Sequence, residues 1–140
     1  MRGGWKFLPT VISDLKLARR NATSTVYMTP SVESLEASIN ALQTTPWPSQ
    51  PECVVFDIET AGEDITLIGL LAVTKAGVPV AIKQVSGTGQ EARDILASSV
   101  LKVGHNVGFD LLKLKLEGIE VNGEVDDSIV MDALLHPGLP

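Results

Sequence analysis

The feature that most constrains the fold is the apolar run Cys53–Ile58, which is rich in valine and is broken by a single acid. A run of this kind predicts a buried strand at the centre of a sheet that other elements cover. The stretch 46–51 before it holds three prolines and predicts an extended linker. We therefore expect an N-terminal helical extension with a proline-rich linker over residues 1–51, and an α/β domain over residues 52–140.

Apolar periodicity predicts the elements around this strand. We expect helices over residues 11–20, 31–43, 90–98, 107–116 and 127–135, and further strands over 66–74, 78–85, 100–103 and 121–125. Ala76-Gly77 predicts a tight hairpin turn, and on helix 107–116 we expect Phe109, Leu112 and Leu116 to pack on the sheet. Strands joined by short connections, followed by alternating helices and strands, predict a mixed sheet with helices packed on it.

Composition limits the classes of function. A net charge of −6 argues against a simple basic surface for nucleic acid, but it does not exclude an enzyme that clusters carboxylates to hold divalent cations. No apolar run approaches the roughly 20 residues that span a bilayer, so no membrane partner is expected. The single cysteine, Cys53, fits a reducing compartment, and we expect a cytoplasmic protein in which this thiol is a buried small hydrophobe.

Two carboxylates, Asp57 and Glu59, stand at the end of the apolar strand. Residues i and i+2 of a strand project from the same face, roughly 6–7 Å apart. Like charges repel and are costly to bury, so a hard divalent cation such as Mg²⁺ would explain the pair. The alternative is that one or both carboxylates cap the following turn and face water.

A third carboxylate, Asp110, lies one turn inside the predicted helix 107–116. It is either a solvent-facing acid favoured by the helix dipole or a ligand facing Asp57 and Glu59. Asn106, just before the helix, is equally suited to cap it. His105 beside it is expected to be mostly structural.

These segments together resemble a known family. Val55–Thr60 resembles the first motif of the DEDD superfamily of 3′–5′ exonucleases, and Gly104–Asn106 with Phe109-Asp110 resembles the second. Ile68–Leu70 matches the family's glycine-centred second strand. The stretch 127–137 resembles the proofreading exonuclease domain of bacterial and phage DNA polymerases of family A, so that the likeness extends from about residue 54 to residue 137.

The resemblance implies a ribonuclease H-like α/β fold and a two-metal site for Mg²⁺ or Mn²⁺, with the ions about 4 Å apart. In this site Asp57 would hold both ions, Glu59 the ion beside the attacking water, and Asp110 the other ion. The implied substrate is the 3′ end of single-stranded DNA. The residues beside its terminal nucleotide would be Thr60, Asn106 and Phe109.

The sequence departs from the family in its third motif, a Tyr or His followed by a fourth carboxylate on a later helix. We therefore expect a domain that is C-terminally incomplete, truncated before that motif. Asp127 is expected to cap the last helix, and His136 to be exposed. Three interpretations stay open: a proofreading exonuclease working with the remainder of a polymerase polypeptide, a catalytically inactive nucleic-acid-binding or scaffold remnant of the same fold, and an RNA-trimming exonuclease.

Overall fold

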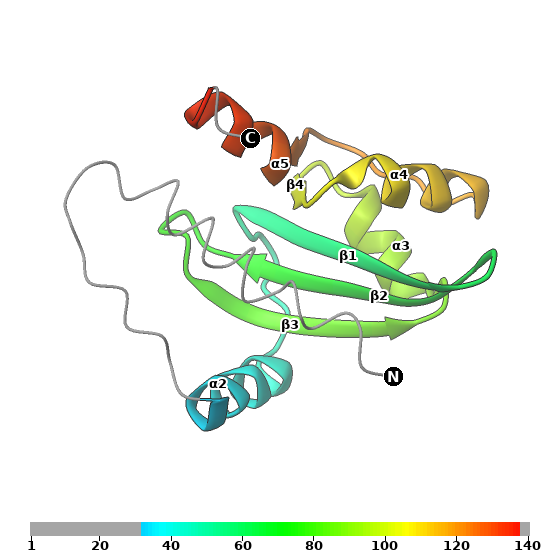
Figure 1. Cartoon of the computed structure of the whole chain (residues 1–140). Coiled ribbons are helices and arrows are strands. Elements are labelled where there is room, and N and C mark those ends of the chain that lie inside the picture. Colours follow the sequence, from blue (N-terminus) through cyan, green and yellow to red (C-terminus); the bar gives the residue numbers. More distant parts are fainter. Residues whose placement is uncertain (1–31, 138–140) are drawn as a thin grey trace.

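The computed structural model describes residues 32–137, which form a five-stranded mixed sheet flanked by helices (Figure 1). The elements in chain order are α2 (Val32–Thr44), β1 (Cys53–Ala61), β2 (Asp64–Val73), β3 (Pro79–Ser86), α3 (Gln90–Ala97), β4 (Leu101–Gly104), α4 (Val107–Leu116), β5 (Val125–Asp127) and α5 (Ser128–Leu135). The helix expected over residues 11–20 lies outside the described residues. In residues 32–137, no helix combines the length and apolarity that a membrane span needs.

The sheet has the strand order β3-β2-β1-β4-β5. β1 pairs antiparallel with β2 and β2 with β3, whereas β4 pairs parallel with β1 and β5 parallel with β4. The predicted strand therefore is the central one. This order and these directions are those of the ribonuclease H-like fold, so the predicted fold class is confirmed.

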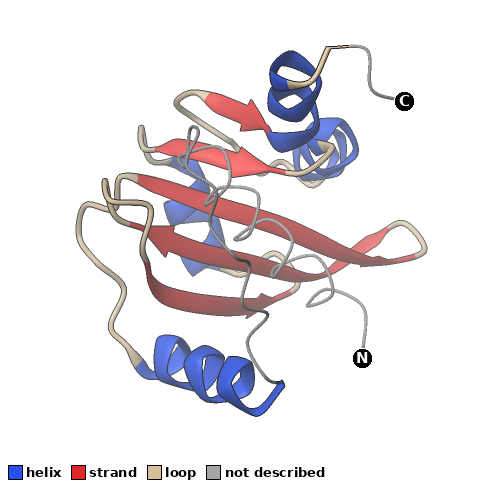
Figure 2. Cartoon of the chain, turned by 60° about the vertical axis from the view of Figure 1, so that its left-hand side comes forward, coloured by secondary structure: helices blue, strands red, loops and turns tan. Residues whose placement is uncertain are grey.

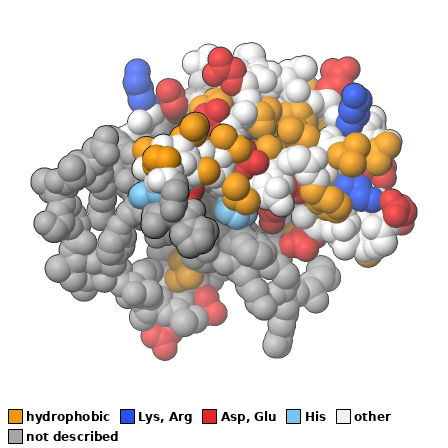
Figure 3. All heavy atoms as spheres, turned by 45° about the horizontal axis from the view of Figure 1, so that its top comes forward, with side chains coloured by type: hydrophobic (Ala, Val, Ile, Leu, Met, Phe, Trp, Pro, Cys, Tyr) orange, Lys and Arg blue, Asp and Glu red, His pale blue; other side chains and the backbone are white. Residues whose placement is uncertain are grey.

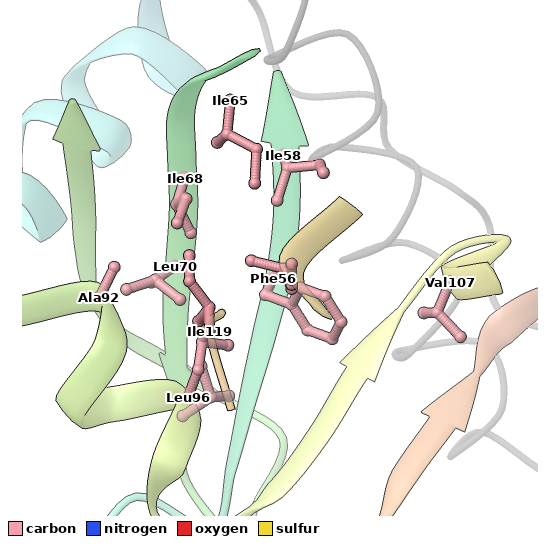
Figure 4. Close-up of a cluster of buried hydrophobic side chains, with 11 residues drawn as sticks. Phe56, Ile58, Ile65, Ile68, Leu70, Ala92, Leu96, Val107 and Ile119 are labelled. Carbon is pink, nitrogen blue, oxygen red and sulfur yellow. The ribbon is translucent and has the colours of Figure 1, made fainter. Parts of the chain in front are cut away.

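Both faces of β1 are buried, as the apolar run predicts. Phe56 and Ile58 belong to a core cluster that includes Ala92 and Leu96 of α3 (Figure 4). Cys53 belongs to a second cluster on the opposite face, against which Ile39 and Leu42 of α2 and Met131 of α5 pack. The sheet is thus sandwiched between α2 on one side and α3 on the other (Figure 2). Cys53 is 8% exposed, which confirms the buried thiol.

The expected packing face of α4 is wrong. Phe109, Leu112 and Leu116 are 51%, 56% and 70% exposed, and the helix instead buries Val107 and Leu114. Apolar residues occur on both stripes of this helix, so the spacing alone could not select the buried stripe.

Exposed apolar side chains gather on two helices. Seven of the eight large hydrophobic side chains that are exposed among the described residues belong to α4 and α5. Figure 3 shows hydrophobic side chains spread over the face that carries these helices, with acidic side chains among them. The two helices therefore present a surface that is unusually apolar for a chain of net charge −6.

The last strand begins later than predicted, at Val125 instead of Val121. Gly123, with φ +83°, turns the chain so tightly that a Cβ there would lie 2.7 Å from the Ser99 carbonyl oxygen. The residues before the strand are held by Lys102 of β4, which is fully buried. Its Nζ donates to the carbonyl and hydroxyl oxygens of Ser98, and to the carbonyl oxygen of Asn122 at 2.7 Å. Burial lowers the pKa of this ammonium group.

Candidate active site

Asp57 and Glu59 lie near the C-terminal end of β1, on the sheet face opposite to Phe56 and Ile58. Asp57 is paired directly across from Gly69 of β2. Paired residues of antiparallel strands point to the same face, so the glycine leaves the space beside the Asp57 carboxylate free of a neighbouring side chain. Both carboxylates are half-buried.

Asp110 approaches Asp57 because one edge of β1 is left unpaired. β4 pairs with β1 only at Cys53, Val54 and Val55, and beyond this point Val107 and Leu114 of α4 share a core cluster with Phe56 and Ile58 of β1. Asp110 is 7% exposed, which excludes the solvent-facing alternative. The backbone N–H of Ile58 lowers the pKa of both the Asp57 and the Asp110 carboxylate, so both carboxylates lie near this group.

The electrostatics of this pair are unfavourable. Burial raises the pKa of Asp57, and the charge of Glu59 raises it further, although Ile58 and His105 oppose the shift. Burial and then the charge of Asp57 raise the pKa of Asp110 to about 7. Among residues 32–137, the ion pairs are Lys83–Glu91, Lys113–Glu63 and His136–Asp132, so none of them neutralises the three candidate carboxylates.

The donor chemistry fits a hard divalent cation, since two poorly solvated carboxylates without a counter-charge are what such an ion stabilises. The side chains do not, however, form a ready ligand cage. Within the described part of the chain, no three His, Cys, Asp or Glu side chains converge closely enough to hold a metal ion. Glu59 interacts with the charge of Asp57, and Asp57 with that of Asp110. A metal that uses all three carboxylates would have to draw their side chains together.

Of the predicted substrate residues, Thr60 lies in β1, and Asn106 and Phe109 lie at the start of α4. Asn106 has left-handed backbone angles (φ 56°, ψ 49°) and its side chain makes no capping hydrogen bond, so the alternative of a capping role is wrong. The side chains of Asn106 and Phe109 are both exposed, and the Phe109 ring centroid lies 6.0 Å from the Lys113 Nζ. Thr60 is half-buried and follows an irregularity in the β1–β2 pairing, between Glu59 and Thr60.

Asp127 takes the capping role that Asn106 lacks. Its carboxylate accepts hydrogen bonds from the backbone N–H groups of Asn106 (2.9 Å), Val107 (3.0 Å) and Ile129 (3.0 Å). The bond to Ile129 confirms the predicted cap of the last helix, whereas the two bonds to α4 were not predicted. Burial alone would raise the pKa of Asp127, but these three donors outweigh it and lower the pKa.

The remaining candidates near the site have structural partners. His105 Nδ1 is hydrogen-bonded to Ser128 Oγ at 2.8 Å. His136 is exposed, as predicted, and its Nδ1 lies 3.0 Å from Asp132 Oδ1. The buried Lys113 Nζ lies 2.6 Å from Glu63 Oε2 in the turn between β1 and β2, which ties this turn to α4.

Comparison with known proteins gives matches only among solved structures. No family model and no curated protein matches the chain. The chain is similar to crystal structures of the EXD2 exonuclease domain. For the crystal soaked in Mn and GMP, the identity is 23% and the TM-score 0.44, over 63% of this chain and 51% of that chain. For the crystal soaked in Mg and dGMP, the identity is 20% and the TM-score 0.45, over 76% of this chain and 58% of that chain. The chain thus spans little more than half of these domains.

Proposed function

We propose that this chain is a metal-dependent 3′–5′ exonuclease domain in which Asp57, Glu59 and Asp110 are the catalytic and metal-binding carboxylates. The observation that carries the proposal is the unneutralised pair of half-buried Asp57 and buried Asp110 near the end of the central strand. A fold keeps such a pair against its electrostatic cost when the pair has a function, because replacing either acid by a neutral residue would remove the cost.

The chemistry follows from the donor set. When bound in a two-metal site, Mg²⁺ or Mn²⁺ lowers the pKa of water and stabilises the leaving 3′ oxygen of a phosphodiester. Asp57, Glu59 and Asp110 bind the ions through oxygen, the ligand that these cations prefer. The Ile58 N–H lies near Asp57 and Asp110 and favours the ionised form of both, which is the form that binds a cation.

The proposed substrate is the 3′ end of single-stranded DNA. The exposed Phe109 ring offers a face on which a terminal base can stack. The Asn106 side chain makes no capping hydrogen bond, so it is available to bind the nucleotide. The strand pairing is irregular between Glu59 and Thr60. A chain of net charge −6 gains little from general electrostatic attraction to nucleic acid. Binding would therefore depend on the metal ions and on these few contacts.

The proposed role is proofreading within a DNA polymerase-like protein, with the remainder of the polymerase polypeptide as partner. The support for this finer assignment is the likeness of the two sequence motifs and of residues 127–137 to the exonuclease domain of family A polymerases. The assignment of DNA instead of RNA has the same support.

One observation favours a second candidate, a nucleic-acid-binding or scaffold domain of the same fold without catalysis. No three potential ligands converge among the described residues, and an exonuclease site needs its ligands held together. In this case Asp57 and Asp110 would bind a metal weakly without positioning a water molecule.

The test combines metal binding with digestion. Mn²⁺ binding is measured by the loss of the free-ion EPR signal, and digestion on single-stranded DNA labelled at the 5′ or the 3′ end, with RNA of the same sequence in parallel. The variant is Asp57→Ala, and its matched control is Asp64→Ala, which removes an exposed acid from the adjacent strand. Circular dichroism establishes that all chains are folded.

A 3′–5′ exonuclease gives a ladder from the 5′-labelled strand and immediate mononucleotide from the 3′-labelled strand, and Asp57→Ala abolishes both. Mn²⁺ binding without cleavage supports the second candidate. A folded wild-type chain that neither binds Mn²⁺ nor cleaves refutes the metal-dependent function. Preferential digestion of RNA over DNA would show that the substrate is RNA.

A further inference from the structure

α4 carries one candidate ligand and two candidate substrate contacts, but it has no N-terminal cap of its own. The first N–H groups of any helix lack partners within the helix. A side chain that caps them needs an N-cap residue with extended backbone, whereas Asn106 has left-handed angles and makes no such bond. The position of α4 must therefore be held by another segment.

Asp127 supplies this restraint from a segment 20 residues further along the chain. One carboxylate oxygen, Oδ1, accepts from the N–H groups of Asn106 and Ile129, and the other, Oδ2, accepts from Val107. A single side chain thus caps the first turns of both α4 and α5. Since both oxygens are engaged by backbone donors, Asp127 is poorly suited to bind a metal ion.

Two further contacts join the same segments. His105 Nδ1 is hydrogen-bonded to Ser128 Oγ at 2.8 Å, and Ser128 is 8% exposed. Gly104 of β4 pairs with Asp127 of β5 in the parallel ladder. The start of α4 is therefore hydrogen-bonded to residues 127–128 through side chains, and the preceding strand pairs with the same segment through its backbone.

The contacts of Asn106 and Val107 with Asp127 lie less than two helical turns from Asp110. Asp110 lies three residues after Val107, and a helix rises about 1.5 Å per residue, so a shift of the first turn is passed on to the Asp110 carboxylate. The Ile58 N–H lowers the pKa of Asp110, so the Ile58 amide resonance is a probe of the place of this carboxylate.

We infer that Asp127 is a positioning residue for the site: by capping α4 from β5, it sets the place of Asp110 relative to Asp57. The inference rests on the proposed function for its catalytic consequence, but the placement of Asp110 itself is independent of activity. Residues that orient metal ligands typically change metal affinity by about 10–100-fold when they are replaced.

The decisive substitution is Asp127→Ser. Serine is as good an N-cap for α5 as aspartate, but its short side chain with one oxygen cannot also bridge to the two N–H groups of α4. A role confined to capping α5 therefore survives this change, whereas positioning does not. Asp127→Asn keeps the length of the side chain and one acceptor oxygen, so it should have an intermediate effect. The matched control is Asp126→Ser, at the exposed neighbouring acid.

Two readouts are needed. Amide resonances of Ile58, Asn106 and Val107 are followed by NMR without metal, and Mn²⁺ affinity is measured by EPR. We expect Asp127→Ser to shift all three resonances and to weaken Mn²⁺ binding about 10-fold or more, with Asp127→Asn between it and the wild type and Asp126→Ser unchanged.

Shifts at Asn106 and Val107 with an unchanged Ile58 resonance would overturn the inference, because Asp110 would then be held without Asp127. A wild-type chain that does not bind Mn²⁺ would refute the proposed function, and the Ile58 resonance would still decide the positioning role. If Asp127→Ser does not fold, Asp127→Asn provides the same decision from the same resonances.

Discussion

Replacing Asp110 by Asn is expected to stabilise the chain in the absence of metal. The free carboxyl of an unfolded chain titrates near 3.9, whereas burial and the charge of Asp57 raise the pKa of Asp110 to about 7 in the folded chain. The difference is about 3 pH units, and each unit corresponds to about 1.4 kcal/mol, so ionised Asp110 opposes folding by about 4 kcal/mol above neutral pH. Asn removes this charge but retains an acceptor for the Ile58 N–H. We expect a net gain of about 2–4 kcal/mol in the free energy of unfolding at about pH 8.

The sign of the pH dependence follows from proton binding. Between about pH 4 and pH 7 the folded chain binds more protons at Asp110 than the unfolded chain, so its stability falls as the pH rises through this window. In Asp110→Asn this contribution to the slope disappears. The two proteins should therefore be close in stability at about pH 4 and diverge toward about pH 8.

Urea unfolding followed by circular dichroism at several pH values measures this difference, with Asp64→Asn as the control for loss of an exposed acid. Mg²⁺ should stabilise the wild type more than Asp110→Asn, because it binds the folded chain through this carboxylate. Equal stabilities at about pH 8, or a less stable variant, would show that burial does not oppose the charge of Asp110, and the electrostatic support for a metal site would be lost.

Two further substitutions test the structure around the site. Gly123→Ala should lower the free energy of unfolding by about 2–4 kcal/mol, because it combines a positive φ with a Cβ 2.7 Å from the Ser99 carbonyl oxygen. The control is Gly62→Ala, at a position that also has a positive φ but open space, and it should lower the free energy of unfolding less in the same urea titration. Equal losses in the two variants would refute the steric reason. Lys102→Met should lower the free energy of unfolding by about 1–3 kcal/mol, because it removes the donor from three oxygen acceptors. Its control is Lys75→Met, at an exposed position. If Lys102→Met loses no more stability than this control, the acceptors find other donors.

The elements of this fold could be predicted where their signals are local. The apolar run gave the central strand, and helix 107–116 was predicted with the bounds that the structure has. Local signals failed where two interpretations fit the same residues. Both stripes of α4 are apolar, so its buried face was predicted wrongly. Asn106 has a residue type suited to capping, but its backbone is left-handed.

The candidate site was predictable to a similar extent. The proximity of Asp57 and Asp110 follows from motifs at strand and helix ends that the topology brings together. The bonds from Asp127 to the start of α4 join residues about 20 positions apart, and no pattern along the chain indicates them. Only the cap of α5, two residues away, carried a local signal. Contacts that depend on how separate elements pack are therefore the part that the sequence alone left out.

The exposed apolar side chains of α4 and α5 have a practical consequence for measuring stability. Dyes that fluoresce on apolar surface will bind the folded chain at these helices, so their signal will start high and rise little on heating. A dye-based thermal shift would then report a weak or absent transition for a chain that unfolds cooperatively. Intrinsic fluorescence is the better probe, because Trp47 packs against the core cluster of β1 and loses this environment only when the core opens.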